Sequence, residues 1–335
     1  MTIKEIAKLA QTSRGTVDRV INKRGNVSKD VRDRILKVLE ETGYKPNQIA
    51  RSLSLSSKKL NIGVVIGTKG NPFFKLVLDG ILNASGKNYN SLLNIIVKEL
   101  YIFDKEAILK ALEELKEEGL DGLIITATND ERIISAINDL NVPTITLSSD
   151  IDVNKISYVG CDYYNSGALI ANFVNLIKPC GTNLALVIGS NNHLGQVDRV
   201  NGFTNTKNDN IRIKTIKETY DDELTTYNEV KTLISNSDLE LIIFLGAGIS
   251  GGLRALEEAN TNIKAITVDL NEEILAGLSS GLVLCTINQH PYTQGVRSLD
   301  LLHEYLIGKK EIEERKIFDN TIILKESIIP HKLNN

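Results

Sequence analysis

The 335-residue chain has no long apolar run and no leader-like start. A membrane-spanning helix needs roughly 18 or more consecutive apolar residues, and no stretch approaches that length. The first residues, Met-Thr-Ile-Lys-Glu-Ile-Ala, alternate charged and apolar side chains, which is not the pattern of a secretory signal. We therefore expect a cytoplasmic protein that has no membrane partner.

Cysteine is also scarce. The chain has three, Cys161, Cys180 and Cys285, which lie far apart in the sequence and have no clustered histidines nearby. An odd number of widely spaced cysteines is typical of buried, inert thiols in a reducing compartment. We expect no disulfide, no metal site and no cofactor.

What the chain does have is a strong charge asymmetry. Residues 1–60 hold 8 lysines and 6 arginines against 6 acidic residues, a net charge of +8. Residues 61–335 hold 25 basic and 36 acidic residues, a net charge of −11. A basic head on an acidic body indicates that the head meets a polyanion, although a merely solvated basic face would have the same composition.

Helical spacing dominates the first 45 residues. Ser13 is a good N-cap for a second helix, Ser28 precedes a third, and Gly43 is its expected end. Two short helices joined by a tight turn and braced by a third predict a helix-turn-helix head. The inward positions are Ile3, Ile6, Ala7 and Ala10 in the first helix, Val17, Val20 and Ile21 in the second, and Val31, Ile35, Val38 and Leu39 in the third.

After a polar, serine-rich linker at 46–59, apolar strands alternate with amphipathic helices. Near-continuous apolar strands of this kind are typical of parallel sheets covered on both faces. The length of this part exceeds one comfortable core, so we predict two doubly wound parallel-sheet lobes. The expected strands include 61–67, 122–126, 144–149, 184–189, 241–246, 264–269 and 283–289.

Several motifs match known families. The head reads Thr2-Ile-Lys-Glu-Ile-Ala-Lys-Leu-Ala, then Ser13-x-x-Thr-Val-x-Arg-Val-x-Asn22, then Gly43-Tyr-x-Pro-Asn47, with Ala50 and Leu53 following. It resembles the lactose-repressor (LacI/GalR) family of transcription regulators. The body carries Asn71-Pro-Phe-Phe74, Arg199-x-x-Gly-Phe203, Asp269 and Thr286-Ile-x-Gln-x-Pro291. It resembles type 1 periplasmic sugar-binding proteins, the ribose-binding kind in particular.

The resemblance implies a helix-turn-helix domain at 1–45, a hinge helix or linker at 46–59 and an effector-binding domain at 60–335. The expected N-lobe covers about 60–161 and 291–320, and the expected C-lobe about 162–289 and 321–335. It also implies a repressor that binds a near-palindromic operator as a homodimer, since one helix-turn-helix covers only a half-site. A sugar-like effector would sit between the lobes.

The second helix is the expected reader of DNA. At 100° per residue, Gly15, Arg19 and Asn22 lie at the middle of its outward face, and Arg14 and Asp18 lie on one shoulder. Gly15 and Asp18 depart from the family, which has a larger side chain and a serine there, so the operator sequence does not carry over. The expected DNA-binding residues are Thr2, Ser13, Arg14, Gly15, Thr16, Asp18, Arg19, Asn22, Asn47, Ala50 and Leu53, of which Leu53 matches a minor-groove wedge beside Ala50.

The expected effector site follows from the body motifs. Phe73 and Phe74 match an aromatic pair that sandwiches a sugar ring. Thr126, Ser148 and Ser149 stand where ribose-type proteins have Asn, Asp and Arg, which argues against ribose itself. The residues expected to hydrogen-bond sugar hydroxyls are Asn71, Arg199, Asp269 and Gln289.

The charge of the effector stays open at this point. The glycine-rich turn 246–252 is expected to leave N–H groups free at a helix N-terminus, which favours a phosphorylated or carboxylated sugar. Asp269 would repel a second negative charge, which favours a neutral sugar.

Three other functions fit parts of the sequence. A solute-binding protein for transport or chemotaxis would share the body but not the basic head. Gly246–Gly251 matches the G-x-G-x-x-G fingerprint of a dinucleotide-dependent oxidoreductase, with Asp269 after the next strand. Gly248–Gly252 matches a hydrolase G-x-S-x-G elbow, followed by Asp269 and His290. Because two enzyme motifs overlap in one glycine-rich turn, neither is independent evidence, and we expect no enzyme.

Overall fold

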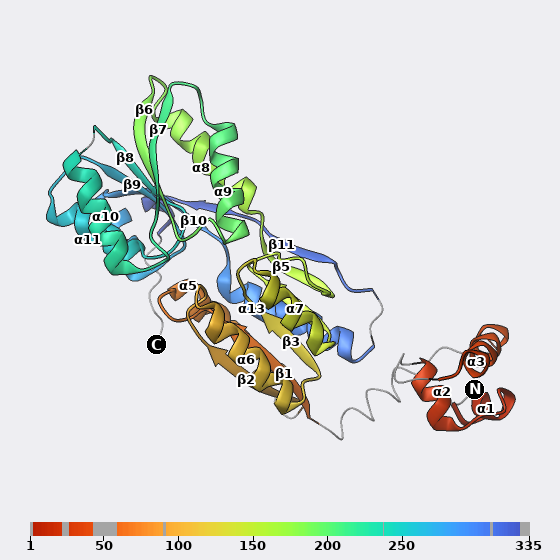
Figure 1. Cartoon of the computed structure of the whole chain (residues 1–335). Helices are drawn as coiled ribbons and strands as arrows, with labels where there is room; N and C mark the ends of the chain where they lie inside the picture. The colour runs from red at the N-terminus through yellow and green to blue at the C-terminus, as the bar shows by residue number, and fades with distance from the viewer. Residues whose placement is uncertain are drawn as a thin grey trace. The chain divides into compact units, whose positions relative to one another are not determined.

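The computed structural model describes residues 3–21, 27–42, 59–89, 92–236, 238–308 and 311–328. The chain divides into two compact units, Met1–Ser54 and Leu55–Asn335, which we call the head and the body (Figure 1). Within the described ranges, no helix is long and apolar enough to cross a membrane.

The head is a small bundle of three helices, α1 (Ile3–Leu9), α2 (Arg14–Ile21) and α3 (Lys29–Glu41). Gln11 has a left-handed φ of 51° in the turn that joins α1 to α2. Ile6, Val17 and Ile35 are fully buried, one from each helix. The helical spacing seen in the sequence therefore gives the three-helix core that was expected.

The body contains two sheets of six strands each. The first sheet has the order β11-β5-β4-β3-β1-β2, all parallel, and forms the N-lobe with its helices. Its elements are β1 (Leu60–Ile66), α5 (Pro72–Asn88), β2 (Leu93–Glu99), α6 (Lys105–Glu118), β3 (Gly122–Ile125), α7 (Glu131–Leu140), β4 (Thr144–Leu147), β5 (Ser157–Cys161), α13 (Pro291–Leu306) and β11 (Arg315–Phe318).

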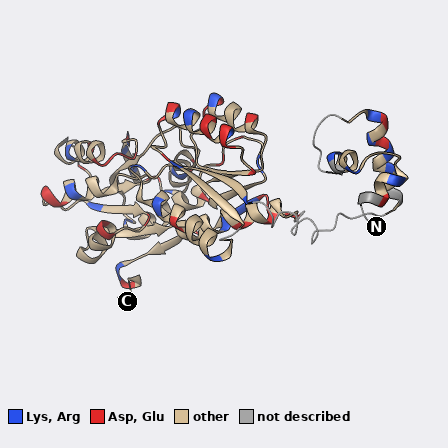
Figure 2. Ribbon diagram, turned by 90° about the horizontal axis from the view of Figure 1, so that it is seen from below, with Lys and Arg blue, Asp and Glu red and all other residues tan. Residues whose placement is uncertain are grey.

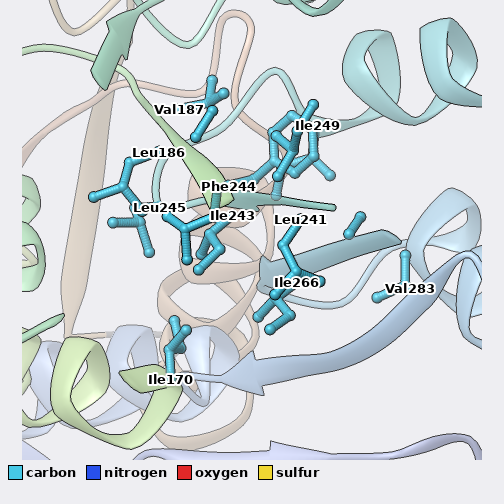
Figure 3. Close-up of a cluster of buried hydrophobic side chains, with 14 of the residues drawn as sticks. Ile170, Leu186, Val187, Leu241, Ile243, Phe244, Leu245, Ile249, Ile266 and Val283 are labelled. Carbon is cyan, nitrogen blue, oxygen red and sulfur yellow. The ribbon is translucent and has the colours of Figure 1, made fainter. Parts of the chain in front are cut away.

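The second sheet forms the C-lobe and has the corresponding order, β12-β10-β9-β8-β6-β7, with only β12 antiparallel. Figure 3 shows the apolar side chains that pack around its central strands. Its elements are α8 (Tyr163–Ile177), β6 (Thr182–Ile188), α9 (Leu194–Thr206), β7 (Ile211–Glu218), α10 (Glu223–Asn236), β8 (Leu241–Phe244), α11 (Ile249–Glu258), β9 (Lys264–Val268), α12 (Glu272–Ser280), β10 (Val283–Asn288), β12 (Thr321–Ile323) and the short helix Lys325–Ser327.

All seven predicted strands end one or two residues earlier than the sequence suggested, and three of them, β4, β9 and β10, end at Leu147, Val268 and Asn288. In two of them the next residue, Ser148 or Asp269, has a left-handed φ, of 57° or 69°. A left-handed residue turns the chain out of the extended conformation, so these strands stop at the edge of the cleft between the lobes.

Each lobe contains one pair of helices that cross at glycines. A Cβ on Gly80 of α5 would lie 2.1 Å from a carbonyl oxygen of α13, and a Cβ on Gly295 of α13 would lie 2.0 Å from one of α5. In the C-lobe, a Cβ on Gly167 of α8 would lie 1.9 Å from a carbonyl oxygen of α9, and a Cβ on Gly202 of α9 would lie 2.0 Å from one of α8. The main chains of each pair are therefore in direct contact, with no room for any side chain at the crossing.

The chain passes between the lobes after β5, after β10 and after β11. Within the described residues, these three segments connect the two lobes. Strands of both sheets end at the cleft, which is where open parallel sheets bind ligands.

Candidate functional site

The second head helix, α2, presents a polar outer face. Val17 and Val20 are buried, whereas Arg14, Gly15 and Arg19 are exposed. Ser13 caps this helix: its Oγ accepts the backbone N–H of Thr16 at 3.1 Å, and the two hydroxyls are 2.8 Å apart. Thr2, Asn22, Asn47, Ala50 and Leu53 lie outside the described residues, as does the side chain of Asp18.

Gly15 is not required by the packing of the head. A Cβ added there would meet only the Oγ of Ser13, at 3.8 Å, which is ordinary contact. Glycine inside a helix costs about 1 kcal/mol relative to alanine. Among the described residues of the head, no packing contact explains that cost.

The described helices of the head carry many basic residues, which Figure 2 shows in blue. Exposed acids, Glu5, Asp30 and Asp33, lie among those of α1 and α3, so the clearest surface for phosphate contacts is that of α2, where Arg14 and Arg19 are exposed. The exposed basic residues are Lys8, Arg14, Arg19, Lys29, Arg32, Arg34 and Lys37.

A second candidate site lies between the lobes of the body. It is a small cavity of about 30 Å³, which we call the deep cavity. Asn71, Phe73 and Phe74 line it from the N-lobe, and Gln289 lines it from a passage between the lobes. The C-lobe contributes Tyr163, His193, Gln196, Arg199, Asp221, Gly246, Ala247, Val268 and Asp269.

Arg199 is the one arginine or lysine among the described residues that line this cavity, and it is 2% exposed. Its guanidinium donates to Ser166 Oγ at 3.2 Å, to Gln289 Oε1 at 2.7 Å and to the carbonyl of Leu245. Gln289 in turn donates from Nε2 to a carboxylate oxygen of Asp269. The predicted residues Arg199, Gln289 and Asp269 therefore form one buried hydrogen-bonded chain.

Asp221 is the centre of a second network. One carboxylate oxygen accepts the backbone N–H of Ala247 at 2.8 Å and Nε2 of Gln196 at 3.3 Å. The other accepts Nδ2 of Asn71 at 3.2 Å, a bond that joins the two lobes. Oε1 of Gln196 accepts the backbone N–H of Gly189 at 2.6 Å. Buried polar groups that pair with each other in this way avoid the cost of an unmade hydrogen bond.

Burial shifts the pKa values of the acids and of the histidine. Desolvation raises the pKa of Asp269 to about 6, even though Arg199 and Gln289 oppose the shift. It also raises the pKa of Asp221. Desolvation, helped by Arg199, lowers the pKa of His193 to about 4, so His193 is neutral at pH 7. The cavity thus has two carboxyl groups against one cation.

The aromatic residues of the cavity do not form the predicted sandwich. The rings of Phe73 and Phe74 pack edge to face, with centroids 5.2 Å apart and planes at 84°. The pair therefore makes one wall rather than two sides of a slot. Tyr163 lies on the C-lobe side, and Cζ of Arg199 lies over its ring, 4.8 Å from the ring centroid.

Three predicted effector residues do not line the deep cavity. Thr126, Ser148 and Ser149 are buried, and Ser148 donates its hydroxyl to Gln294 at 3.1 Å. Four residues that do line it, Tyr163, His193, Gln196 and Asp221, were missed by sequence reasoning. The His193-x-x-Gln196 spacing at the start of α9, one turn before Arg199, was the available signal for two of them.

The glycine-rich turn 246–252 has a packing explanation. A Cβ on Gly246 would lie 2.5 Å from the backbone nitrogen of Gly189, and one on Gly251 would lie 1.9 Å from a carbonyl oxygen. The N–H of Ala247 in this turn already binds the carboxylate of Asp221. The hydrolase reading has no support from the contacts, since Ser250 pairs with Asn271 and His290 pairs with Thr321.

Comparison with known proteins agrees with this arrangement. Residues 2–47 match the lacI family of bacterial regulatory proteins, and residues 62–310 match the periplasmic binding protein domain. The fold and these matches define a DNA-binding transcription regulator whose effector domain is like a periplasmic binding protein, not an enzyme. The chain belongs to the lacI family of regulators, and the predicted family and fold class are confirmed.

Two curated relatives are informative. Catabolite control protein A of Staphylococcus epidermidis is 25% identical over 346 residues, which cover 99% of this chain and 97% of that protein. The NTD biosynthesis operon regulator NtdR of Bacillus subtilis is 37% identical over 131 residues, which cover 39% of this chain and 38% of that protein.

Solved structures share the fold of the body. GanP, a glucose-galactose binding protein from Geobacillus stearothermophilus, has a TM-score of 0.73 at 22% identity, covering 81% of this chain and 99% of GanP. A transporter solute-binding protein from Burkholderia graminis, solved with D-arabinose, has a TM-score of 0.74 at 18% identity, covering 80% of this chain and 96% of that one.

Proposed function

We propose that this regulator is a repressor that binds a near-palindromic operator as a homodimer and is controlled by a neutral sugar in the deep cavity. In this proposal residues 1–45 read DNA, residues 46–59 form a hinge and residues 60–335 bind the effector. The observation that carries the control by an effector is the hydrogen bond between Asn71 and Asp221, because it joins the two lobes inside the cavity that the effector would enter.

The DNA side rests on the outer face of α2. Arg14 and Arg19 each have the planar fork that pairs with guanine in the major groove, and Gly15 between them lets the helix backbone come close to the base edges. Ser13 and Thr16 lie at the start of the helix, where phosphate contacts are common. A single helix-turn-helix covers one half-site, so a second copy is needed for the other half.

The hinge part of the proposal concerns residues outside the described ranges. Leu53 would insert into the minor groove, with Ala50 beside it. Replacing Leu53 by alanine is expected to weaken operator binding much more than binding to unrelated DNA. Equal losses on both kinds of DNA would remove the wedge from the proposal.

The effector side rests on the charges of the cavity. Asp221 already occupies the N–H of Ala247, so that part of the glycine-rich turn is not available to an incoming anion. Asp269 adds a second carboxyl group against the single guanidinium of Arg199. An anionic sugar would meet this excess of acid, which favours a neutral polyhydroxyl ligand. GanP is a glucose-galactose binding protein and the Burkholderia protein was solved with D-arabinose, and these neutral sugars agree with this class.

The switching step follows from the internal hydrogen bonds. At about 30 Å³ the deep cavity is well below the roughly 300–1,000 Å³ of ordinary ligand pockets, so the lobes must separate before a sugar ring enters. Separation breaks the bond from Asn71 to Asp221, and sugar hydroxyls then pair with both groups. A ligand that binds one lobe arrangement more tightly shifts the population toward it.

The test combines DNA binding with ligand screening. Full-length protein is titrated with promoter DNA from beside its own gene and with scrambled DNA, at several salt concentrations. We expect selective binding that weakens steeply with salt, because phosphate contacts release counterions. Thermal shift then compares each sugar with its phosphate and its acid. Binding that ignores DNA sequence contradicts the regulator reading, and stabilisation by the anionic forms alone contradicts the neutral effector.

A further inference from the structure

A larger cavity lies beside the deep cavity, also between the lobes. It measures about 540 Å³, within the ordinary range for ligand pockets, and we call it the outer groove. Tyr101, Phe103 and Thr128 line it from the N-lobe, and Ser190 and Tyr220 line it from the C-lobe. Nothing in the proposed function uses these residues.

The outer groove and the deep cavity share one turn of the chain. Tyr220 and Asp221 are consecutive residues with left-handed φ values of 55° and 56°. Asp221 lines the deep cavity, whereas Tyr220 lines the outer groove. Gly70 of the N-lobe lies near residues of both cavities, since a Cβ there would lie 3.7 Å from the ring of Tyr101 and 3.9 Å from the carbonyl oxygen of Asp221. The two cavities are therefore neighbours.

Three aromatic rings gather in the outer groove. The centroids of Tyr101 and Phe103 are 5.6 Å apart, and those of Phe103 and Tyr220 are 6.3 Å apart. Tyr220 is 51% exposed although it packs in this cluster. Exposed ring surface beside a polar wall is what the apolar C–H face of a sugar ring packs against.

One hydroxyl of the groove has no partner among the described residues. Oγ1 of Thr128 is inaccessible to solvent, and the residue is 1% exposed. A buried hydroxyl without a hydrogen bond costs about 1–3 kcal/mol, and because Thr128 lines the groove, a ligand hydroxyl that enters when the lobes separate would relieve that cost. Oγ1 of Thr126 is equally buried and unpaired, but Thr126 lines neither cavity.

The charged groups of the groove are already paired. Lys105 lies 2.8 Å from the carboxylate of Asp130. Asp222 accepts the backbone N–H of Thr225 at 2.7 Å as part of the start of α10. Aromatic rings, hydroxyls and internally paired charges suit a neutral, hydroxyl-rich ligand better than an ion.

We propose that the effector is a neutral saccharide of at least two rings, with one ring in the deep cavity and the second in the outer groove. The second ring packs against Tyr220 and the neighbouring aromatic rings, and one of its hydroxyls pairs with Thr128. This inference rests on the proposed function, because it extends the same effector past the turn that holds Asp221.

The experiment measures binding to the full chain by calorimetry. D-Glucose and D-galactose are compared with maltose, cellobiose, trehalose, lactose and melibiose, which join these rings through different linkages. We expect at least one disaccharide to bind about tenfold more tightly than either of its component sugars.

Two variants assign that gain to the groove. Tyr220→Asn keeps a residue that tolerates left-handed φ, and Thr128→Val removes only the hydroxyl. Each is expected to reduce the disaccharide gain severalfold while leaving monosaccharide affinity within about twofold. The matched controls are Thr126→Val, an equally buried threonine outside the groove, and Tyr305→Asn, an exposed tyrosine that lines neither cavity. Both controls should bind like the wild type.

The outcomes separate the two proposals. If monosaccharides bind and no disaccharide gains affinity, the second-ring inference is wrong and the proposed function stands. The inference also fails if Thr128→Val and Thr126→Val change binding equally, since Thr128 is then only structural. If no sugar of either length binds, the proposed sugar effector is overturned, and the second ring with it.

Discussion

The outer face of α2 and the deep cavity treat polar groups in opposite ways. On α2, Arg14 and Arg19 are exposed, with Gly15 between them leaving open space. In the cavity, Arg199 and Asp221 are each 2% exposed and hydrogen-bonded to neighbouring protein groups. The polar groups on the outer face of α2 are exposed to solvent, whereas those of the deep cavity already make hydrogen bonds with each other.

This difference bears on selectivity. In the proposed function DNA would bind the outer face of α2, where Arg14 and Arg19 have no protein partner among the described residues. A ligand in the cavity must replace hydrogen bonds that the protein already makes, so one with missing or misplaced hydroxyls leaves buried groups unpaired, at about 1–3 kcal/mol each. We therefore expect the deep cavity to bind a sugar with matching hydroxyls much more tightly than sugars whose hydroxyls are missing or misplaced.

The largest expected effect comes from breaking the cavity network at Arg199. Arg199→Ala leaves Gln289, Ser166 and the carbonyl of Leu245 without their donor. We expect the body to lose roughly 3–5 kcal/mol of unfolding free energy in urea and to lose sugar binding. Arg212→Ala, which removes an exposed arginine of the same lobe, is the control. A loss below about 1 kcal/mol would show that the network contributes little.

A smaller effect is expected from Asp269→Asn, and it depends on pH. Because burial raises the folded-state pKa of Asp269 from 3.8 to about 6, the folded protein holds this proton more tightly than the unfolded chain. Asp269 therefore destabilises the fold as pH rises from about 4 to 6. We expect the asparagine variant to match the wild type at pH 4 and to exceed it by about 3 kcal/mol at pH 7, with weaker sugar binding.

The pKa of His193 is shifted in the opposite direction, and its effect on stability cancels when the wild type is compared with Asp269→Asn. Its pKa is lowered to about 4, so it destabilises the fold as pH falls below about 6.5, equally in both proteins. Chemical denaturation of the two proteins at pH 4, 5, 6 and 7 gives the difference directly. A difference that is constant across this range contradicts the raised pKa of Asp269.

On the α2 side, Arg19→Ala is expected to cost about 1–3 kcal/mol of operator affinity, because a bidentate contact with a base is lost. Binding to scrambled DNA should weaken less, and sugar binding should not change. Fluorescence anisotropy with both DNAs makes the measurement, again with Arg212→Ala as the charge-matched control. Equal weakening on both DNAs would make Arg19 a phosphate contact rather than a base reader.

The smallest effect separates stability from recognition. Gly15→Ala should raise the unfolding free energy of the head by about 0.5–1 kcal/mol, because a Cβ fits there and alanine favours the helix. The same methyl group should weaken operator binding by holding the backbone away from the bases. If both quantities stay at wild-type values, the glycine serves neither purpose.

Much of the fold was predictable because burial repeats along the chain. Val17 and Val20 are spaced as one helix face, and strands such as β8 are buried at every position. Residues near strand ends in the sequence, such as Asp269 and Gln289, therefore came together at the cleft. The sequence does not show on which side of a strand end a side chain lies. Ser148 is at the right edge, but it turns to Gln294.

Asp221 is a residue of the deep cavity whose role could not be predicted from the sequence. It follows β7, an edge strand whose burial alternates, and it sits in a turn made by two left-handed residues. Asp221 tolerates a left-handed φ, but Tyr220 before it is not a usual turn residue, so the sequence did not indicate two consecutive left-handed residues here. Its role depends on tertiary contacts with Asn71, Gln196 and Ala247, which lie far away or across the lobes.

The helix pairs that cross at glycines limit how the cleft can move. Gly167 and Gly202 hold α8 against α9 by main-chain contact, and α9 carries Gln196 and Arg199. Sliding one helix along the other would drive each glycine's neighbours into a carbonyl group. We therefore expect each lobe to move as a rigid body and the cleft to open by rotation about the three interlobe passages of the described chain. A bend within a lobe is not needed to admit a sugar, and a probe pair placed inside one lobe should report a constant distance while a pair spanning the cleft reports the motion.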